Sequence, residues 1–170
     1  MAEIGTDIER AAVYLRQGKL VAIHTDTVYG LAGNAFDEKS ILTIFKVKRR
    51  PADTPLIAQT NSLDKVKKLV THLPIEAGIL AHNFWPGALT LILEKSDLIP
   101  DIMTSGRPTV GIRIPNHPMT LELLSKIDFP LAVPSANIHG EPSPTTAKEV
   151  EEQIGDQIDY ILDGGKCTVG

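Results

Sequence analysis

Two cations and two short polar side chains stand at the ends of expected helices and strands. Lys48 and Arg50 close a helical pattern, and Ser135 and Asn137 follow a short apolar run that Pro134 ends. A bound triphosphate needs charge neutralisation from Lys and Arg, together with directional donors from hydroxyl, amide and backbone N–H groups. These four side chains supply that inventory. A helix dipole also favours cations in the last turn, so residue type alone leaves a surface role for Lys48 and Arg50 open.

A third cation, Arg113, interrupts the otherwise apolar run from 109 to 114. An arginine in a strand that is apolar on both faces is costly unless its charge is paired. We therefore expect Arg113 to meet either an acidic side chain or an anionic ligand.

Several common kinds of site are absent from the sequence. It contains no GxxxxGK[ST] phosphate loop and no GxGxxG after a strand, which sets aside both common nucleotide folds. The five histidines lack metal-ligand spacing, so we assign no metal-binding residue. The single cysteine, Cys167, permits no internal disulfide and is a poor candidate for structural zinc.

The charges are segregated along the chain. The net charge is -4, residues 141–163 carry seven acids and one base, and Lys46, Lys48, Arg49 and Arg50 form the densest basic cluster. Local potential rather than net charge governs where an anion docks, so this cluster is the expected anion site. Aromatic residues make up only 5% and the basic run is short, which disfavours an RNA-binding surface.

Strand and helix patterns alternate along the chain. We expect helices over residues 7–17, 37–48, 62–70, 74–82, 118–127 and 145–154, and strands over 20–23, 56–58, 88–93, 109–114, 131–133 and 159–162. This alternation predicts an α/β sheet with helical cover, and 170 residues suit a single domain over 1–170. The longest apolar runs are too short to span a membrane and the start lacks a signal pattern, so we expect a cytoplasmic protein.

Five stretches occur together in an order and spacing that resemble the YrdC-like threonylcarbamoyl-AMP synthases. They are TDTVYGL at 25–31, KRRP at 48–51 with Pro55-Leu56, FWPG at 84–87 with Leu89-Thr90, RIP at 113–115, and PSAN at 134–137. The resemblance covers residues 17–165. It implies a twisted, open, mixed α/β sheet with helical cover and a large concave, positively lined cavity.

The resemblance also implies an activity, its substrates and its partners. The family condenses L-threonine, bicarbonate and ATP into threonylcarbamoyl-AMP, with release of pyrophosphate and with Mg²⁺ accompanying ATP. The product supplies a downstream tRNA threonylcarbamoyltransferase machinery that modifies tRNA to threonylcarbamoyladenosine. From the same resemblance we expect that the protein can bind tRNA or double-stranded RNA and that it has no membrane partner.

The resemblance also implies which residues form the site, because positions of this chain match the family's motifs. Lys48, Arg50, Ser135 and Asn137 match the family's KxR and SxN signature and are expected to be catalytic and to bind ATP. Further ATP contacts are expected from Thr54, Thr109 and Ser143. L-Threonine is expected to contact Thr27, Gln59, Arg113 and Tyr29, although core packing is an equal alternative for Tyr29.

The chain departs from the family pattern at a few points. Thr54 stands where Asn is usual, Gln59 where His is frequent, and His24 where Pro commonly precedes the first Thr of the motif. Family members continue past the Gly164-Gly165 turn into a Glu-Ser-Thr segment, so we expect a chain truncated at its C-terminus. Two alternatives remain open: a noncatalytic RNA-binding module, and a YrdC-like domain of a carbamoyltransferase.

Overall fold

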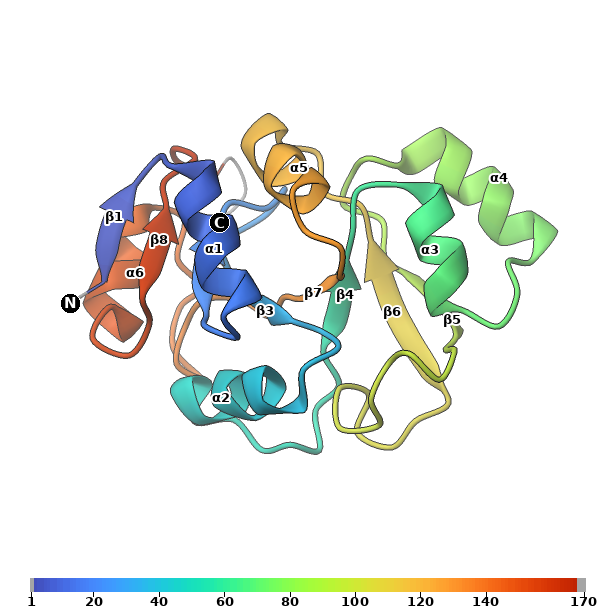
Figure 1. Ribbon diagram of the computed structural model, residues 1–170, viewed down its shortest axis with the longest axis horizontal. Coiled ribbons are helices and arrows are strands. Elements are labelled where there is room, and N and C mark those ends of the chain that lie inside the picture. The colour runs from blue at the N-terminus through green and yellow to red at the C-terminus, as the bar shows by residue number, and fades with distance from the viewer. Residues whose placement is uncertain (1, 168–170) are drawn as a thin grey trace.

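A mixed eight-stranded sheet runs through the part of the chain that the computed structural model describes, residues 2–167 (Figure 1). Its strand order is β1-β8-β2-β3-β7-β4-β6-β5. The strands are β1 (Glu3–Gly5), β2 (Val21–Ile23), β3 (Gly30–Asn34), β4 (Ile57–Gln59), β5 (Leu91–Glu94), β6 (Thr109–Arg113), β7 (Leu131–Ala132) and β8 (Tyr160–Leu162). The helices are α1 (Ile8–Arg16), α2 (Glu38–Lys48), α3 (Leu63–Leu69), α4 (Ile75–Phe84), α5 (Pro118–Ser125) and α6 (Ala147–Ile154).

The sheet combines parallel and antiparallel pairs. Strands β1 and β2 both pair in parallel with β8, and β4 pairs in parallel with β6. The pairs β2–β3, β3–β7, β4–β7 and β5–β6 are antiparallel. This confirms the predicted mixed α/β architecture.

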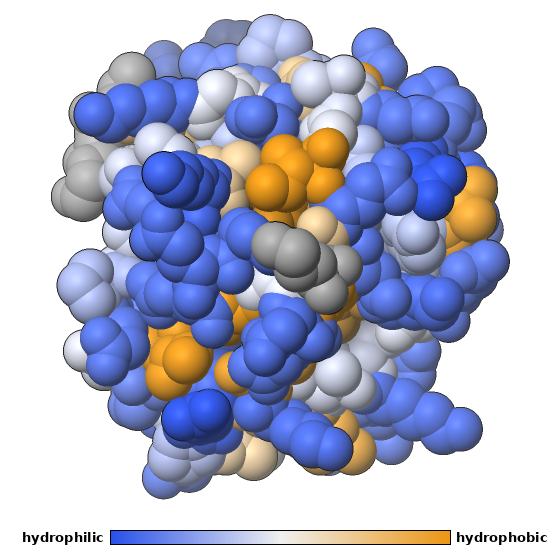
Figure 2. Space-filling model, turned by 90° about the vertical axis from the view of Figure 1, so that its left-hand side faces the viewer, coloured by the Kyte–Doolittle hydropathy of each residue, from blue (hydrophilic) through white to orange (hydrophobic). Residues whose placement is uncertain are grey.

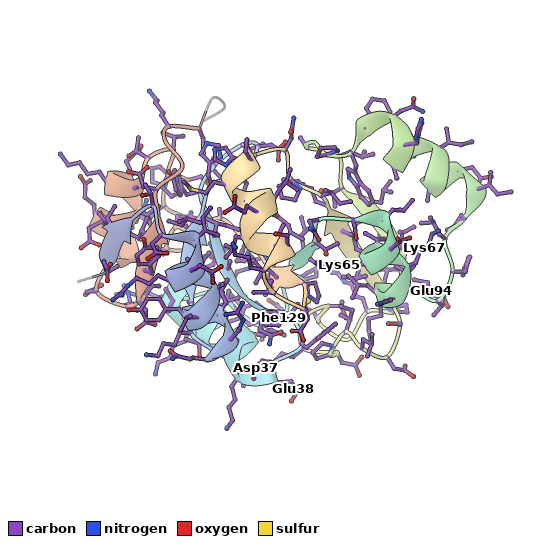
Figure 3. All side chains as sticks on the ribbon, turned by 45° about the horizontal axis from the view of Figure 1, so that its top comes forward. Asp37, Glu38, Lys65, Lys67, Glu94 and Phe129 are labelled. Atoms are coloured by element: carbon purple, nitrogen blue, oxygen red, sulfur yellow. The ribbon has the colours of Figure 1, made fainter. Side chains whose placement is uncertain are left out.

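Two hydrophobic cores hold the helices to the sheet. Residues of α1 and α5, such as Leu15 and Leu123, pack with Val21 and Tyr160 of the strands. The larger core joins the inner faces of α2, α3, α4 and α6 to the remaining strand side chains. Lys65 ties α3 to α5, because its Nζ donates to the Leu124 carbonyl at 3.2 Å (Figure 3). These contacts hold the strand ends that carry the polar residues.

Side-chain caps determine where several helices begin. Asp7, Asp37, Ser62 and Thr146 each accept a hydrogen bond from a backbone N–H in the first turn of the following helix. Helix α2 ends at Lys48 because Arg49 adopts a left-handed conformation, with φ of 53°. That reversal leaves Lys48 on the buried side of the helix end and sends Arg50 into the next turn.

The face of the molecule on the β1 and α6 side is largely hydrophilic (Figure 2). It includes part of the acidic segment 141–163 that the sequence singles out. Within residues 2–167, no helix has the length and apolar character needed to cross a membrane.

Two strands lie outside the predicted set, and one begins three residues later than predicted. β1 is a three-residue edge strand with exposed positions, and it lacks the apolar run that marks a buried strand. β3 contains Gly30 and Gly33, and glycine is depleted in strands. A Cβ at Gly33 would lie 2.8 Å from Leu20 Cδ2, so close packing explains the glycine. The predicted strand 88–93 begins only at Leu91.

Candidate active site

The Lys48 ammonium group is buried at the end of α2 against the turn that follows β7. Lys48 is 2% exposed, and its Nζ donates to Ser135 O at 2.7 Å, Asn137 O at 2.9 Å and Asn137 Oδ1 at 2.9 Å. The Ser135 hydroxyl donates to the same Asn137 Oδ1. Asn137 Nδ2 in turn donates to the Glu141 carbonyl at 2.6 Å. Lys48, Ser135 and Asn137 therefore form one hydrogen-bonded cluster, in which Lys48 holds the turn directly.

Two opposing effects act on the charge of Lys48. Burial, and secondarily the positive charge of Arg50, lower the pKa of Lys48 to about 8. Its three short hydrogen bonds to oxygen atoms favour the ammonium form. At neutral pH the group is therefore a cation held in a poorly solvated position, where an approaching anion meets little screening.

Arg50 follows Lys48 by two residues and keeps unused donors. Its Nη2 donates to the Pro55 carbonyl at 3.2 Å, whereas its buried Nε has no partner among residues 2–167. Burial lowers the pKa of Arg50, but an arginine remains protonated in proteins. Thr54 lies half-buried in the same turn, with its N–H bonded to Pro51 O at 3.4 Å. The turn thus offers a cation and a hydroxyl close together.

A small cavity of about 190 Å³ lies beside the cluster. It is lined by Thr25, Thr27, Gln59, Arg113 and Ser135, with Val28, Gly30, Ile57, Val133 and Pro134 completing the wall. Gln59 is 2% exposed, and its Oε1 is buried without a hydrogen-bond partner in the described part of the chain. Ser135 belongs both to this cavity and to the Lys48 cluster, so the two are contiguous.

Arg113 contacts a neutral hydroxyl and not an acidic side chain. Its Nε and Nη2 both donate to Thr90 Oγ1, at 3.1 and 2.8 Å. Arg113, Lys48 and Arg50 form no ion pair within residues 2–167. Of the two expected partners the acidic side chain is therefore contradicted, and the anionic ligand stays a prediction.

Three predicted site residues lie away from this cavity wall. Tyr29 is fully buried, and its hydroxyl donates to Gly165 O at 2.6 Å and accepts from Gly164 N at 3.0 Å. Tyr29 thus fits the packing alternative and does not line the cavity. Thr109 begins β6 at the end opposite Arg113, about 13 Å away along the strand. Ser143 is exposed, next to Pro144.

Two further residues shape the site without having been assigned to it from the sequence. Thr25 is 4% exposed, and its Oγ1 donates to Val28 O and accepts from the backbone N–H of Thr27 at 3.3 Å. Thr25 therefore folds the loop that presents Thr27. Thr90 contacts Arg113 as described above. Both residues lie within the motif stretches 25–31 and 84–90, and this position could have identified them as site residues from the sequence.

Two histidines stack where the last described residues approach the loop before Thr25. The rings of His24 and His117 lie 3.9 Å apart, centre to centre, and His117 Nε2 is 3.2 Å from Gly164 O. Burial, followed by the charge of His117, lowers the pKa of His24. Across residues 2–167, no three His, Cys, Asp or Glu side chains gather in a way that could hold a metal ion.

Comparisons with known proteins agree on one group. Residues 13–170 match the Sua5/YciO/YrdC family model, whose description reads "Telomere recombination". The threonylcarbamoyl-AMP synthase of Pyrococcus abyssi is 47% identical over 163 residues, or 96% of this chain and 48% of that protein. The synthase of Bacillus subtilis is 42% identical over 164 residues, or 96% of this chain and 47% of that protein. The chain spans about half the length of these relatives.

Solved structures of other proteins share this fold over all or nearly all of the chain. The crystal structure of P. abyssi Sua5 complexed with L-threonine has a TM-score of 0.95 at 44% identity, covering 100% of this chain and 52% of that one. Full-length HypF in its phosphate- and nucleotide-bound form has a TM-score of 0.83 at 26% identity, covering 96% of this chain and 25% of that one.

Proposed function

Because this chain belongs to the Sua5/YciO/YrdC family, we propose that it carries the ATP and L-threonine sites of an L-threonylcarbamoyladenylate synthase. Such an enzyme condenses L-threonine, bicarbonate and ATP into threonylcarbamoyl-AMP and pyrophosphate. The names of the P. abyssi and B. subtilis relatives support this proposal, as does the threonine complex of P. abyssi Sua5. The adenylate would then pass to a tRNA threonylcarbamoyltransferase.

One observation carries the proposal: Ser135 joins the Lys48 cluster to the small cavity that contains Thr27, Gln59 and Arg113. A cavity of about 190 Å³ is smaller than the roughly 300 Å³ at which drug-sized pockets begin, and it suits a molecule as small as an amino acid. The cationic cluster suits a phosphate chain. A shared wall would place the amino acid next to the phosphates.

The proposed reaction depends on positioning and charge stabilisation, and it requires no covalent intermediate with the protein. The amine of L-threonine attacks bicarbonate with loss of water, or CO₂ with loss of a proton, to give a carbamate. A carbamate oxygen then attacks the α-phosphorus of ATP and pyrophosphate leaves. The increasing negative charge on the phosphates would be stabilised by Arg50 and by Lys48, while Ser135 and Asn137 supply polar contacts.

Each half of the site has a proposed role in binding. The Arg113 guanidinium would pair with the carboxylate of L-threonine, because arginine binds carboxylates in a bidentate manner. The unpartnered Gln59 Oε1 would accept a hydrogen bond from the threonine amine or hydroxyl, and Thr27 would contact the same molecule. Thr54, beside Arg50, is proposed to contact the nucleotide, as are Thr109 and Ser143.

Mg²⁺ is proposed to enter the site with ATP. It commonly keeps several waters and is bound through substrate phosphates and only one or two carboxylates. We therefore assign no residue of this chain as its ligand. When bound, Mg²⁺ would neutralise phosphate charge next to the Lys48 and Arg50 cations.

Pyrophosphate release from ATP and bicarbonate, measured with and without L-threonine, tests the proposal. Release that requires L-threonine supports the synthase. RNA binding without turnover would favour the noncatalytic module, and carbamoyl phosphate replacing L-threonine and bicarbonate would favour a carbamoyltransferase domain. Separate binding measurements for ATP and L-threonine distinguish a missing site from a missing chemical step.

A matched pair of variants tests the cationic cluster. Arg50→Ala removes a guanidinium with a buried, unpartnered Nε, and we expect it to abolish most pyrophosphate release. Arg49→Asn alters the exposed neighbour and keeps a residue type that tolerates its left-handed backbone, so activity should persist. Equal activity of the two variants would contradict the assignment of Arg50.

A further inference from the structure

The Thr90 hydroxyl holds one edge of the Arg113 guanidinium. Its Oγ1 accepts from Nε at 3.1 Å and from Nη2 at 2.8 Å, so a single oxygen bridges two nitrogens of the same edge. A guanidinium is planar and has five N–H donors in fixed directions. Fixing one edge of this plane therefore fixes the direction of the opposite, terminal edge.

The surrounding strands determine how the Thr90 side chain is oriented. Thr90 directly precedes β5, whose Leu91 pairs with Ile112 of β6, so Thr90 lies across from Arg113 in the same antiparallel register. Its Cγ2 methyl would lie 3.2 Å from a Cβ at Gly111, in space that the glycine leaves open. A β-branched residue has few χ1 choices. With the methyl over Gly111, the hydroxyl faces Arg113.

The terminal edge of Arg113 is the part left for a ligand. Thr90 uses Nε and one Nη2 hydrogen, whereas no hydrogen bond or salt bridge within residues 2–167 involves Nη1. Arg113 also lines the 190 Å³ cavity with Thr27 and Gln59. Two parallel N–H groups on such an edge match the two oxygens of a carboxylate.

From this geometry we infer that Thr90 is a positioning residue, which orients Arg113 so that its terminal edge binds the α-carboxylate of the amino acid. The inference rests on the proposed function and adds to it how the cavity selects a free carboxylate. Thr90 touches Arg113 and not the substrate. Its effect should therefore depend on the ligand having a carboxylate.

Thr90→Val is the decisive variant because it keeps the branched shape and the methyl over Gly111 but removes the oxygen acceptor. Affinity is measured by calorimetry for L-threonine and for L-threoninol, the analogue that has an alcohol in place of the carboxylate. We expect L-threonine to bind roughly tenfold more weakly, as for one hydrogen bond to a charged group. L-Threoninol and ATP should each change less than about twofold, within the scatter of such measurements.

Two further variants complete the test. Thr90→Ser keeps the hydroxyl and should restore most of the L-threonine affinity. Thr71→Val serves as a control, because it changes an exposed threonine whose hydroxyl contacts His72 and not Arg113. An equal loss for L-threonine and L-threoninol, or no loss in Thr90→Val, would overturn the inference alone. Failure of the unaltered chain to bind L-threonine would overturn the proposed function and this inference together.

Discussion

Raising the pH through 8 should weaken nucleotide binding, because the Lys48 ammonium loses its proton in this range. Burial and the neighbouring Arg50 lower the pKa of Lys48 to about 8, well below the ordinary value of 10.5. The neutral amine would no longer attract phosphate. It would also donate at most two hydrogen bonds to the oxygens of Ser135 and Asn137, where the ammonium donates three.

The size of the effect follows from the protonated fraction of Lys48. With a pKa of about 8, roughly three quarters of the protein carries the ammonium at about pH 7.5, and only about 3% does so at about pH 9.5. If only the protonated form binds, the affinity for ATP should fall about 25-fold between these two values, since affinity follows the pKa of the free protein.

Calorimetric or fluorescence titration with ATP is the suitable assay. Turnover is less direct, because the amine of threonine also titrates in this range. Lys48→Met should bind ATP weakly at every pH, without the alkaline decline. Lys46→Met alters an exposed lysine two residues earlier and should keep the wild-type profile. A flat profile in the unaltered protein, or the same decline in Lys48→Met, would refute the role given to the Lys48 charge.

Alkaline unfolding of the protein through Lys48 would not explain a decline in ATP affinity. The lowered pKa of Lys48 makes the folded protein more stable, not less stable, as the pH rises. The folded-state pKa of Lys48 lies below the unfolded value, so the unfolded chain binds more protons between about pH 8 and 10.5. The contribution of Lys48 to the free energy of unfolding therefore rises with pH in this window. The difference between 10.5 and about 8 corresponds to about 3 kcal/mol at most.

Three other substitutions test separate parts of the structure. Thr27→Val should raise the L-threonine requirement more than the ATP requirement in steady-state kinetics, and the reverse order would count against its place in the amino-acid half. Tyr29→Phe should lower the free energy of unfolding in urea by about 1–3 kcal/mol through loss of the bonds to 164–165, with ATP affinity unchanged; a purely catalytic defect would contradict this. Gly30→Ala should cost about 1–3 kcal/mol, because its Cβ would overlap Val133 Cγ1, and adding Val133→Ala should restore part of that stability; no recovery in the double variant would contradict this explanation.

The predictable parts of the fold are those that depend on local pattern. Helix α2 begins at the Asp37 cap and ends before Pro51, as its residues indicate. β3 could not be predicted in this way, because Gly30 and Gly33 are present to accommodate close neighbours and not to favour a strand. β1 is stabilised by pairing with β8, a contact between distant parts of the chain that no local pattern reveals.

The same limit applies to the site. Residue types alone do not decide whether Lys48 lies on the surface or in the site. The structure buries it against the turn after β7. The motif resemblance made the grouping of Lys48, Ser135 and Asn137 predictable. The link from Thr90 to Arg113 depends on the register of β5 against β6, and neither periodicity nor composition specifies which residues face each other. The roles in ligand binding remain predictions for the experiments above.

The position of β4 between β7 and β6 has a consequence for how the protein is made. Both neighbours of β4 come later in the chain, and the contact from Lys48 to Asn137 spans 89 residues. Loop-closure entropy must be overcome before such distant pairs form, which slows folding relative to proteins rich in local contacts. On the ribosome, α2 would leave the exit tunnel long before its partner turn is synthesised. Both proposed ligand sites would therefore take shape only when most of the domain has emerged.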